Sequence, residues 1–189
     1  MERDEQLYAR AMAGDRSSLT ELVARYHGPL LKFLFRVTGQ KQSAEDLLQE
    51  TFIRILKYRG ATPQRFRPWA YQIAHNLARD YFRSAVVRRE VGAQPDDELD
   101  DERMADPQDT EALELQSYDR QQVAFLLQHL PANQREVLVL RFYHELPLEE
   151  ISEITGAPLG TVKSRLFHGL RRARQILELD EVNRDERSC

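Results

Sequence analysis

The chain has 189 residues, of which 41% are hydrophobic and 31% charged, and its formal net charge is −4. This length allows one or two domains, and no stretch approaches the roughly 18 uncharged apolar residues of a membrane-spanning helix, so no membrane insertion is expected. Few glycines and prolines, and few β-branched residues alternating with polar ones, indicate an all-helical protein.

The motif content argues against an enzyme and against a metal or cofactor protein. The one cysteine, Cys189, cannot form an internal disulfide, which fits a reducing compartment and predicts a cytoplasmic protein. The first ten residues, MERDEQLYAR, lack the apolar stretch of a secretory signal peptide. The sequence has no His-Glu-x-x-His, no phosphate loop and no Gly-x-Ser-x-Gly, and one cysteine excludes a Cys-rich zinc site.

Helical spacing of apolar residues predicts helices at about 4–12 and 17–37, followed by a third helix that opens at Ser43. Asp46 follows Ser43 by three residues, as in a capping box. The polar face of this third helix includes Gln49 and Glu50 and also exposes Ile53, which is a weak indication of an interface.

A fourth helix is predicted at about 68–87, with Trp69, Ile73, Leu77 and Tyr81, joined by Ala74 and Ala78, on its buried side. The predicted polar side carries Tyr71, Gln72, His75, Asn76, Arg79 and Arg83. Between Arg65 and Arg89 there are six arginines and one acid, Asp80. Arginines interleaved with aromatic residues suit single-stranded nucleic acid, in which aromatic walls hold unstacked bases.

An acidic stretch separates this helical part from the rest of the chain. Between Val91 and Asp119 there are eleven acidic residues and one arginine, so the stretch has a net charge of −10 and the remainder of the chain +6. Its composition from Val91 to about Pro107 predicts a disordered or extended linker. A solubilising spacer and a functional segment explain this composition equally well.

Beyond predicted helices at about 110–130 and 133–143, residues 146–174 read as a helix, a short turn and a second helix. Gly156 fits the end of the first helix and Thr161 the N-cap of the second. Val162, Leu166, Leu170 and Ala173 form the apolar face of the second helix. Residues 157–174 contain five Lys or Arg and no acid, as expected for a helix-turn-helix in the DNA major groove. The alternative is a solvated basic face on an ordinary helical hairpin.

Three blocks of sequence carry a resemblance to the sigma-70 family of bacterial sigma factors, in its small extracytoplasmic-function (ECF) group. AEDLLQETFIRILKY (44–58) resembles region 2.2, and FRPWAYQIAHNLARDYFR (66–83) resembles regions 2.3 and 2.4. Residues 130–174, from LPANQREV to GLRRAR, resemble region 4. The resemblance implies two small helical domains, region 2 at 1–90 and region 4 at 113–179, an acidic flexible linker at 91–112 and a polar tail at 180–189.

The resemblance also implies partners and sites. RNA polymerase core enzyme would bind through Asp46, Gln49, Glu50 and Ile53. The −35 promoter element would be read as duplex DNA by Thr161, Lys163, Ser164, Arg165, His168 and Arg171. The melted −10 element would be captured by Gln64, Arg65, Phe66, Tyr71, Asn76, Arg79 and Arg83. An anti-sigma factor is a further partner typical of the group.

Two other functions remain open at this point. The first is a stand-alone helix-turn-helix regulator that needs no polymerase. The second is a helical protein-interaction bundle, which would show no salt-sensitive DNA binding.

Overall fold

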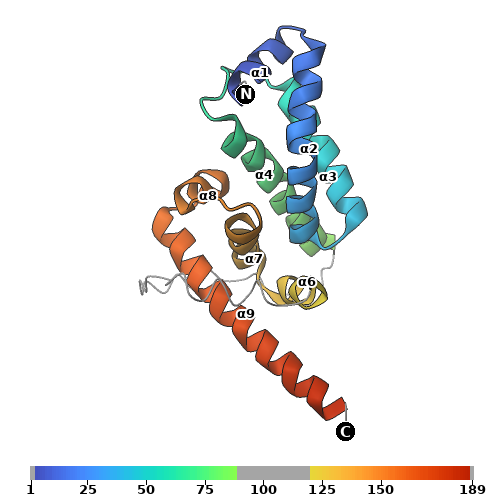
Figure 1. The fold of residues 1–189 in the computed structure, drawn as a ribbon, viewed down its shortest axis with the longest axis vertical. Helices are drawn as coiled ribbons and strands as arrows, with labels where there is room; N and C mark the ends of the chain where they lie inside the picture. Colours follow the sequence, from blue (N-terminus) through green and yellow to red (C-terminus); the bar gives the residue numbers. More distant parts are fainter. Residues whose placement is uncertain (1–2, 89–119, 188–189) are drawn as a thin grey trace. The chain divides into compact units, whose positions relative to one another are not determined.

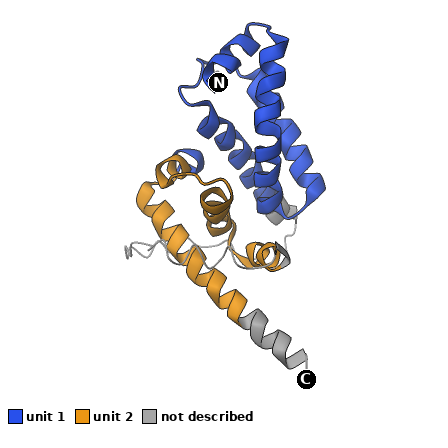
Figure 2. Cartoon of the chain, in the orientation of Figure 1, with its two compact units in different colours: residues 1–93, 153–156 blue, residues 94–152, 157–189 orange. Residues whose placement is uncertain are grey.

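A computed structural model of the chain describes residues 3–88 and 120–187, and every regular element in these two stretches is a helix (Figure 1). The all-α prediction is confirmed for this part of the chain, whereas the predicted linker at 91–112 lies outside the described residues. The chain divides into two compact units (Figure 2). Unit 1 comprises residues 1–93 with 153–156, and unit 2 comprises residues 94–152 with 157–189.

Four helices build the N-terminal part of unit 1: α1 (Asp4–Met12), α2 (Arg16–Thr38), α3 (Lys41–Lys57) and α4 (Phe66–Arg88). α2, α3 and α4 pack on one another, and α1 packs on α2 and α4. The core between them is formed by fully buried side chains, which include Leu7, Leu22, Leu30, Phe33, Leu34, Ile55 and Phe66. The first helix begins and ends where the sequence predicted, and the others begin one or two residues earlier.

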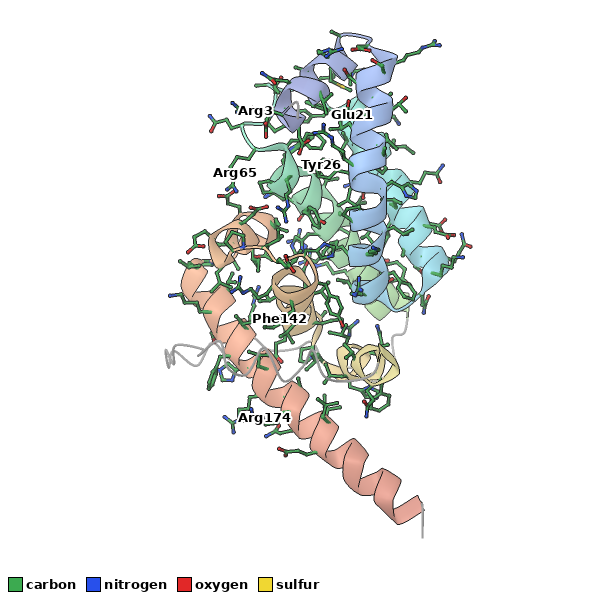
Figure 3. The ribbon with its side chains drawn as sticks, in the orientation of Figure 1. Arg3, Glu21, Tyr26, Arg65, Phe142 and Arg174 are labelled. Atoms are coloured by element: carbon green, nitrogen blue, oxygen red, sulfur yellow. The ribbon has the colours of Figure 1, made fainter. Side chains whose placement is uncertain are left out.

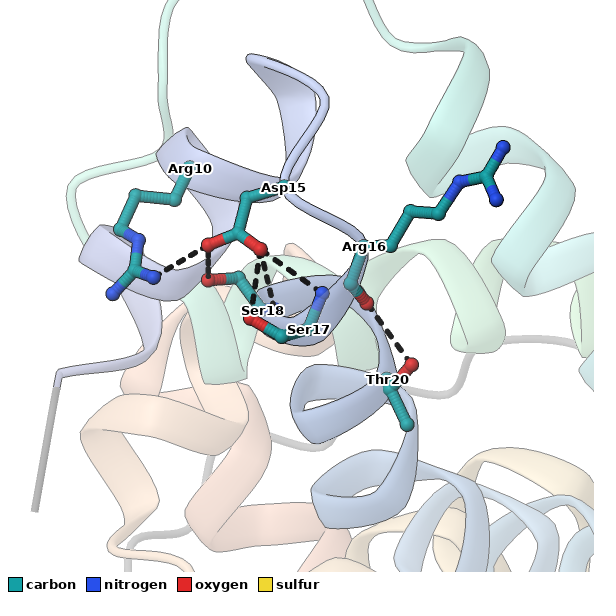
Figure 4. Close-up of polar contacts among 6 residues, drawn as sticks. All are labelled: Arg10, Asp15, Arg16, Ser17, Ser18 and Thr20. Atoms are coloured by element: carbon teal, nitrogen blue, oxygen red, sulfur yellow. Dashed lines mark hydrogen bonds and ion pairs between the residues drawn. The ribbon is translucent and has the colours of Figure 1, made fainter.

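A polar cluster around Asp15 fixes the connection between α1 and α2 (Figure 4). Gly14 turns the chain with a φ of 101°, a conformation that glycine adopts without strain. Asp15 is the N-cap of α2: its Oδ1 accepts the Ser17 backbone N–H at 3.0 Å, and its Oδ2 accepts the Ser18 hydroxyl at 2.7 Å. Arg10, in the last turn of α1, forms an ion pair with the same carboxylate. The turn is therefore stabilised by contacts of Asp15 with residues of both α1 and α2.

A second carboxylate joins α1 to the middle of α2. Asp4 accepts hydrogen bonds from Arg25 Nη1 at 2.6 Å and from the hydroxyl of Tyr26, whose place on α2 is labelled in Figure 3. Burial and the bond to Asp4 both raise the pKa of the Tyr26 phenol above its usual value. Tyr26 therefore stays protonated and remains a hydrogen-bond donor at physiological pH.

The buried face of α4 agrees with the prediction only in part, since Leu77, Ala74 and Ala78 are buried as expected. Its centre is a row of small residues, Ala70, Ala74 and Ala78, and Tyr71 and His75 are buried beside them. Trp69, Ile73 and Tyr81, expected inward, are only half-buried. Small residues let α4 approach α2 and α3 closely, so the large side chains fit at the edges of the contact.

The capping box predicted at Ser43 is absent, because α3 begins two residues earlier with Gln40 as its N-cap. The Ser43 hydroxyl instead lies 3.2 Å from Gln40 Oε1 and 3.0 Å from the Tyr81 hydroxyl of α4. These contacts connect the start of α3 to α4.

The remaining described helices are α6 (Arg120–His129), α7 (Ala132–Leu138), α8 (Leu148–Thr155) and α9 (Leu159–Arg187), with one π-helical turn, η1 (Val139–Tyr143), after α7. In unit 2, α9 packs on α6 and α7. Its Gly169 lies so close to α7 that a Cβ there would be 3.1 Å from Leu138 Cδ1. The chain turns after η1 at Glu145, which has a φ of 52°, and the Leu146 N–H bonds back to the Leu140 carbonyl at 3.1 Å.

α9 continues through most of the predicted polar tail, as far as Arg187. Residues 188–189, and with them Cys189, lie outside the described residues. Across the described stretches, no helix combines the length and the apolar character that a bilayer crossing requires.

The Asp15 cluster predicts a pH-dependent contribution to stability. Hydrogen bonds from Ser17, Ser18 and Arg10 lower the pKa of the Asp15 carboxyl in the folded chain. The ionised carboxylate therefore stabilises the fold above its unfolded pKa of about 3.9, and this stabilisation is lost as the pH falls toward the lower, folded pKa. We expect Asp15→Asn to lower the Tm by a constant amount above about pH 5, and this difference to shrink below about pH 4. A difference in Tm that is unchanged at about pH 2.5 would contradict this assignment.

Candidate nucleic-acid and polymerase interfaces

The predicted helix-turn-helix is formed by α8, a turn and the start of α9. Gly156 ends α8 with a φ of 70°, as a glycine after a helix C-terminus commonly does. The Ser152 hydroxyl donates to the Ala157 carbonyl at 2.6 Å and so closes the turn. α9 begins earlier than predicted, because the Pro158 carbonyl already accepts the Val162 N–H at 3.0 Å. Thr161 therefore lies inside the helix, and its predicted role as the N-cap is wrong.

α9 has a buried apolar stripe, and its basic residues are distributed around the rest of the helix. The predicted apolar residues Val162, Leu166, Leu170 and Ala173 are all buried, and Leu177 continues their stripe. Of the residues predicted to read DNA, Arg171 is exposed. The others are half-buried: Thr161, Lys163, Ser164, Arg165 and His168. Helical spacing brings Thr161, Arg165 and His168 to one side of the helix.

The basic character continues along α9. Arg172 and Arg174, the second of which is labelled in Figure 3, are exposed beside Arg171. No acidic residue lies between Ala157 and Arg174. The first half of α9 thus offers a row of hydrogen-bond donors, which suits phosphates and guanine edges.

The predicted −10 residues of unit 1 are of two kinds: polar side chains that are exposed or half-buried, and aromatic rings that are buried. Gln64 and Arg65, in the segment between α3 and α4, are exposed, as are Arg79 and Arg83 on α4. Asn76 is half-buried and lies on the side of α4 that also carries Arg79 and Arg83, because the three are spaced by three and four residues. The polar surface of unit 1 is defined by these five side chains, of which Gln64 and Arg65 precede α4 and Asn76, Arg79 and Arg83 lie further along that helix.

Phe66 and Tyr71 do not belong to that surface, contrary to the prediction that placed them at the DNA strand. Phe66 is 1% exposed, and its ring centroid lies 4.9 Å from that of Tyr26 and 5.3 Å from that of Tyr8. Tyr71 is 2% exposed and packs on Phe33 at a centroid distance of 5.6 Å. Both rings are part of the core of unit 1, where they pack on α1 and α2.

The predicted polymerase-binding residues share one side of α3. Asp46 and Gln49 are exposed, whereas Glu50 and Ile53 are half-buried. Glu50 Oε1 accepts a hydrogen bond from Arg54 Nε at 2.9 Å, one turn further on. The surface therefore combines an acidic end with one accessible aliphatic side chain.

Residues that the sequence analysis missed lie at the two ends of the segment between α3 and α4. Tyr58 is 40% exposed, and its ring packs edge-on against Trp69 at 5.0 Å. The phenol of Tyr58 covers Gly60, where an added Cβ would be 2.2 Å from the Tyr58 hydroxyl oxygen. At the other end, Glu5 of α1 accepts the backbone N–H of Phe66 at 2.9 Å. No local sequence pattern indicated these contacts of Tyr58 and Glu5.

The position of Tyr71 predicts the effect of two substitutions on stability. We expect Tyr71→Ala to lower the free energy of unfolding by about 3–5 kcal/mol, because it empties a packed site beside Phe33. Asn76→Ala, at a half-buried site on the same helix, is expected to cost less than about 1 kcal/mol. Urea unfolding of both variants measures the difference. Equal, small losses would place Tyr71 outside the core.

Two family models match the chain: Sigma-70 region 2 at residues 22–87 and Sigma-70, region 4 at residues 120–173. The first covers most of α2, α3 and α4, and the second runs from α6 into the basic part of α9. The two matches thus fall on the two stretches that carry the candidate interfaces.

Curated relatives resemble the chain over nearly its whole length. The RNA polymerase sigma-H factor of Pseudomonas aeruginosa is 30% identical, over 94% of this chain and 93% of the relative. The ECF RNA polymerase sigma-E factor of Haemophilus influenzae is 31% identical, over 93% of both chains.

Solved structures give the same result for the fold. CnrH, solved in complex with the cytosolic domain of CnrY, aligns with a TM-score of 0.64 and 25% identity, over 94% of this chain and 98% of that chain. The sigma factor RpoE of Bartonella quintana, solved with the anti-sigma factor NepR, aligns with a TM-score of 0.61 and 20% identity, over 86% and 98%.

The family models and the relatives agree with the resemblance seen in the sequence and decide between the open alternatives. They favour neither a stand-alone regulator nor an interaction bundle, because both sigma regions are present in one chain and in the order of the relatives. The chain therefore belongs to the ECF group of the sigma-70 family, which is non-catalytic, and it directs RNA polymerase to promoters.

Proposed function

We propose that the two units divide promoter recognition between them and that a third surface binds the polymerase. The first half of α9 reads the −35 element as duplex DNA. The polar surface of unit 1 captures the melted −10 strand, and the outer side of α3 binds the core enzyme in the cytoplasm. The observation that carries the proposal is the basic first half of α9, in which an apolar stripe is buried and no acidic residue occurs up to Arg174.

Within α9 the side chains suit different parts of the −35 duplex. Arg165 and Lys163 can donate to guanine or to phosphates, and Thr161 and Ser164 can bond to several bases. The exposed Arg171, Arg172 and Arg174 lie further along the helix, where a recognition helix leaves the groove and meets the backbone. Base contacts near the start of α9 would set the sequence, and the later arginines would hold the register.

In unit 1 we assign −10 capture to Gln64, Arg65, Asn76, Arg79 and Arg83. Phe66 and Tyr71 support this surface from the core and do not contact the DNA. Unstacking a base costs a few kcal/mol, so contacts with phosphates and with the polymerase must supply the remaining free energy.

The acidic stretch between the regions allows one chain to reach both elements. A linker of about 25 residues spans at most ~80–90 Å, and two elements about two DNA turns apart lie roughly 70 Å from each other. Its negative charge would favour basic polymerase channels that otherwise take nucleic acid. An anti-sigma factor, the further partner typical of the group, stays a prediction for this chain.

If α9 reads the −35 element and α3 binds the core enzyme, substitutions in α9 should impair promoter recognition and leave core binding intact. We expect Arg165→Ala to cost about 1–3 kcal/mol of discrimination for the −35 sequence while binding to core polymerase persists. Lys163→Ala, if it removes a phosphate contact, should reduce the salt dependence of promoter binding by about one unit of slope. Run-off transcription and core-binding assays measure both effects, and Arg16→Ala, which removes an exposed charge at the start of α2, is the control.

Substitutions on the outer side of α3 should have the opposite effect: they should impair core binding and leave −35 preference intact. We expect Asp46→Ala combined with Gln49→Ala to weaken binding to core polymerase, because both side chains are exposed on the same side of α3. The preference for −35 sequences in the residual transcription should be unchanged. Equal loss of core binding and −35 preference in either set of variants would refute the division of work.

A further inference from the structure

The segment 59–65 between α3 and α4 contains Gln64 and Arg65, and its C-terminal end is held by a residue from the beginning of the chain. Glu5, in the first turn of α1, accepts the backbone N–H of Phe66, the first residue of α4, through its Oε1 at 2.9 Å. The two residues are 61 positions apart. Phe66 follows Arg65 directly, so this bond fixes the point at which the segment joins the helix.

The bond satisfies a backbone group at the start of α4. The first N–H groups of a helix have no partner within the helix, and a polar side chain just before it normally accepts one of them. Here Gln64 and Arg65 precede the helix, and both are exposed. The Glu5 carboxylate of α1 accepts such a group from another helix, and its charge also suits the positive end of the α4 dipole.

Other contacts of α1 reach both ends of the same segment. The Tyr8 hydroxyl donates to the Ile55 carbonyl in the last turns of α3 at 3.3 Å. The Tyr8 ring packs on Phe66 at 5.3 Å and on Trp69 at 5.4 Å, at the start of α4. Trp69 in turn packs on Tyr58, just before the segment. α1 therefore connects the exit from α3 with the entry to α4.

We propose that Glu5 is a positioning residue for −10 recognition: by holding the Phe66 N–H, it sets the placement of Gln64 and Arg65 against the melted DNA strand. The inference rests on the proposed function, because it assumes that this segment reads the −10 element. Glu5 itself is half-buried behind the segment and needs no contact with DNA.

Three substitutions of Glu5 separate the effect of its side-chain length from the effect of its charge. Glu5→Gln keeps an oxygen at the same distance that can accept the Phe66 N–H. Glu5→Asp keeps the charge, but its carboxylate is shorter by one methylene. Glu5→Ala removes both. If the hydrogen bond is what matters, the Gln variant should resemble the wild type, and the Asp and Ala variants should share one defect.

The measurement is transcription by polymerase holoenzyme from a promoter library randomised at the −10 element, with the −35 element constant. We expect Glu5→Asp and Glu5→Ala to weaken the preference for the best −10 base about fivefold to tenfold, the size of one lost hydrogen bond. Preference for the −35 sequence and affinity for core polymerase should be unchanged. Amide hydrogen exchange should show a less protected Phe66 N–H in the same two variants.

Asp4→Asn is the matched control for a merely structural effect. Asp4 is the neighbour of Glu5 in the same turn, but it bonds to Arg25 and Tyr26 of α2 and not to α4. It should lower the Tm without changing the −10 preference. The inference is overturned if Asp4→Asn changes the −10 preference as Glu5→Asp does, or if neither Glu5→Asp nor Glu5→Ala changes it.

Variants of Gln64 and Arg65 distinguish a failure of the proposed −10 role of unit 1 from a failure of the role of Glu5. Gln64→Ala and Arg65→Ala remove the side chains that we assign to the −10 strand. If these two variants leave the −10 preference unchanged, the segment does not read DNA and the proposal for unit 1 fails with it. If they change the preference while the Glu5 variants do not, only the positioning role of Glu5 is wrong.

Discussion

The organisation of unit 1 depends on the packing of Phe66. Its ring is buried against Tyr8 of α1 and Tyr26 of α2, and its backbone N–H bonds to Glu5. One residue thus joins three helices and also ends the segment that presents Gln64 and Arg65. Because aromatic rings bury a large area and pack with defined geometry, this contact restricts where α4 can start. The exposed side chains around it can then vary without a change of fold, which suits a surface that distinguishes promoters.

The two units present their cations differently. On α9 the basic residues surround the buried apolar stripe of a single helix, an arrangement that fits a groove of regular duplex. In unit 1 the arginines are spread over the segment before α4 and over the outer side of that helix, an arrangement that fits a strand whose bases are splayed out. A chain with a net charge of −4 can still bind DNA in this way, because the stretch between the two regions has a net charge of −10 and the rest of the chain +6. The same concentration of charge would oppose tight DNA binding by the chain alone.

The helices themselves were predictable, since long amphipathic patterns and Gly156 mark them clearly, and the resemblance to sigma regions 2 and 4 led to the family. The sequence placed Leu77, Ala74 and Ala78 on the buried side of α4 correctly, but it also placed Trp69 there, which is half-buried, and it put the buried Tyr71 and His75 on the polar side. It also placed the start of α9 at Thr161, although Pro158 already accepts the first helical hydrogen bond. The contact between Glu5 and Phe66 joins residues 61 positions apart, and no local pattern indicates such a pair. The resemblance to region 2 placed Phe66 and Tyr71 at the DNA strand, whereas both rings are buried in the core of unit 1.

The central claim is that neither unit recognises a promoter strongly until the polymerase aligns them. Fluorescence anisotropy of a labelled promoter fragment, titrated with the purified chain at physiological salt with and without core polymerase, tests this directly. The account predicts weak binding, with little sequence preference, for the chain alone, and tight binding that depends on both the −35 and −10 sequences once core polymerase is present. Tight and sequence-specific binding by the chain alone, with no gain on adding core polymerase, would contradict it.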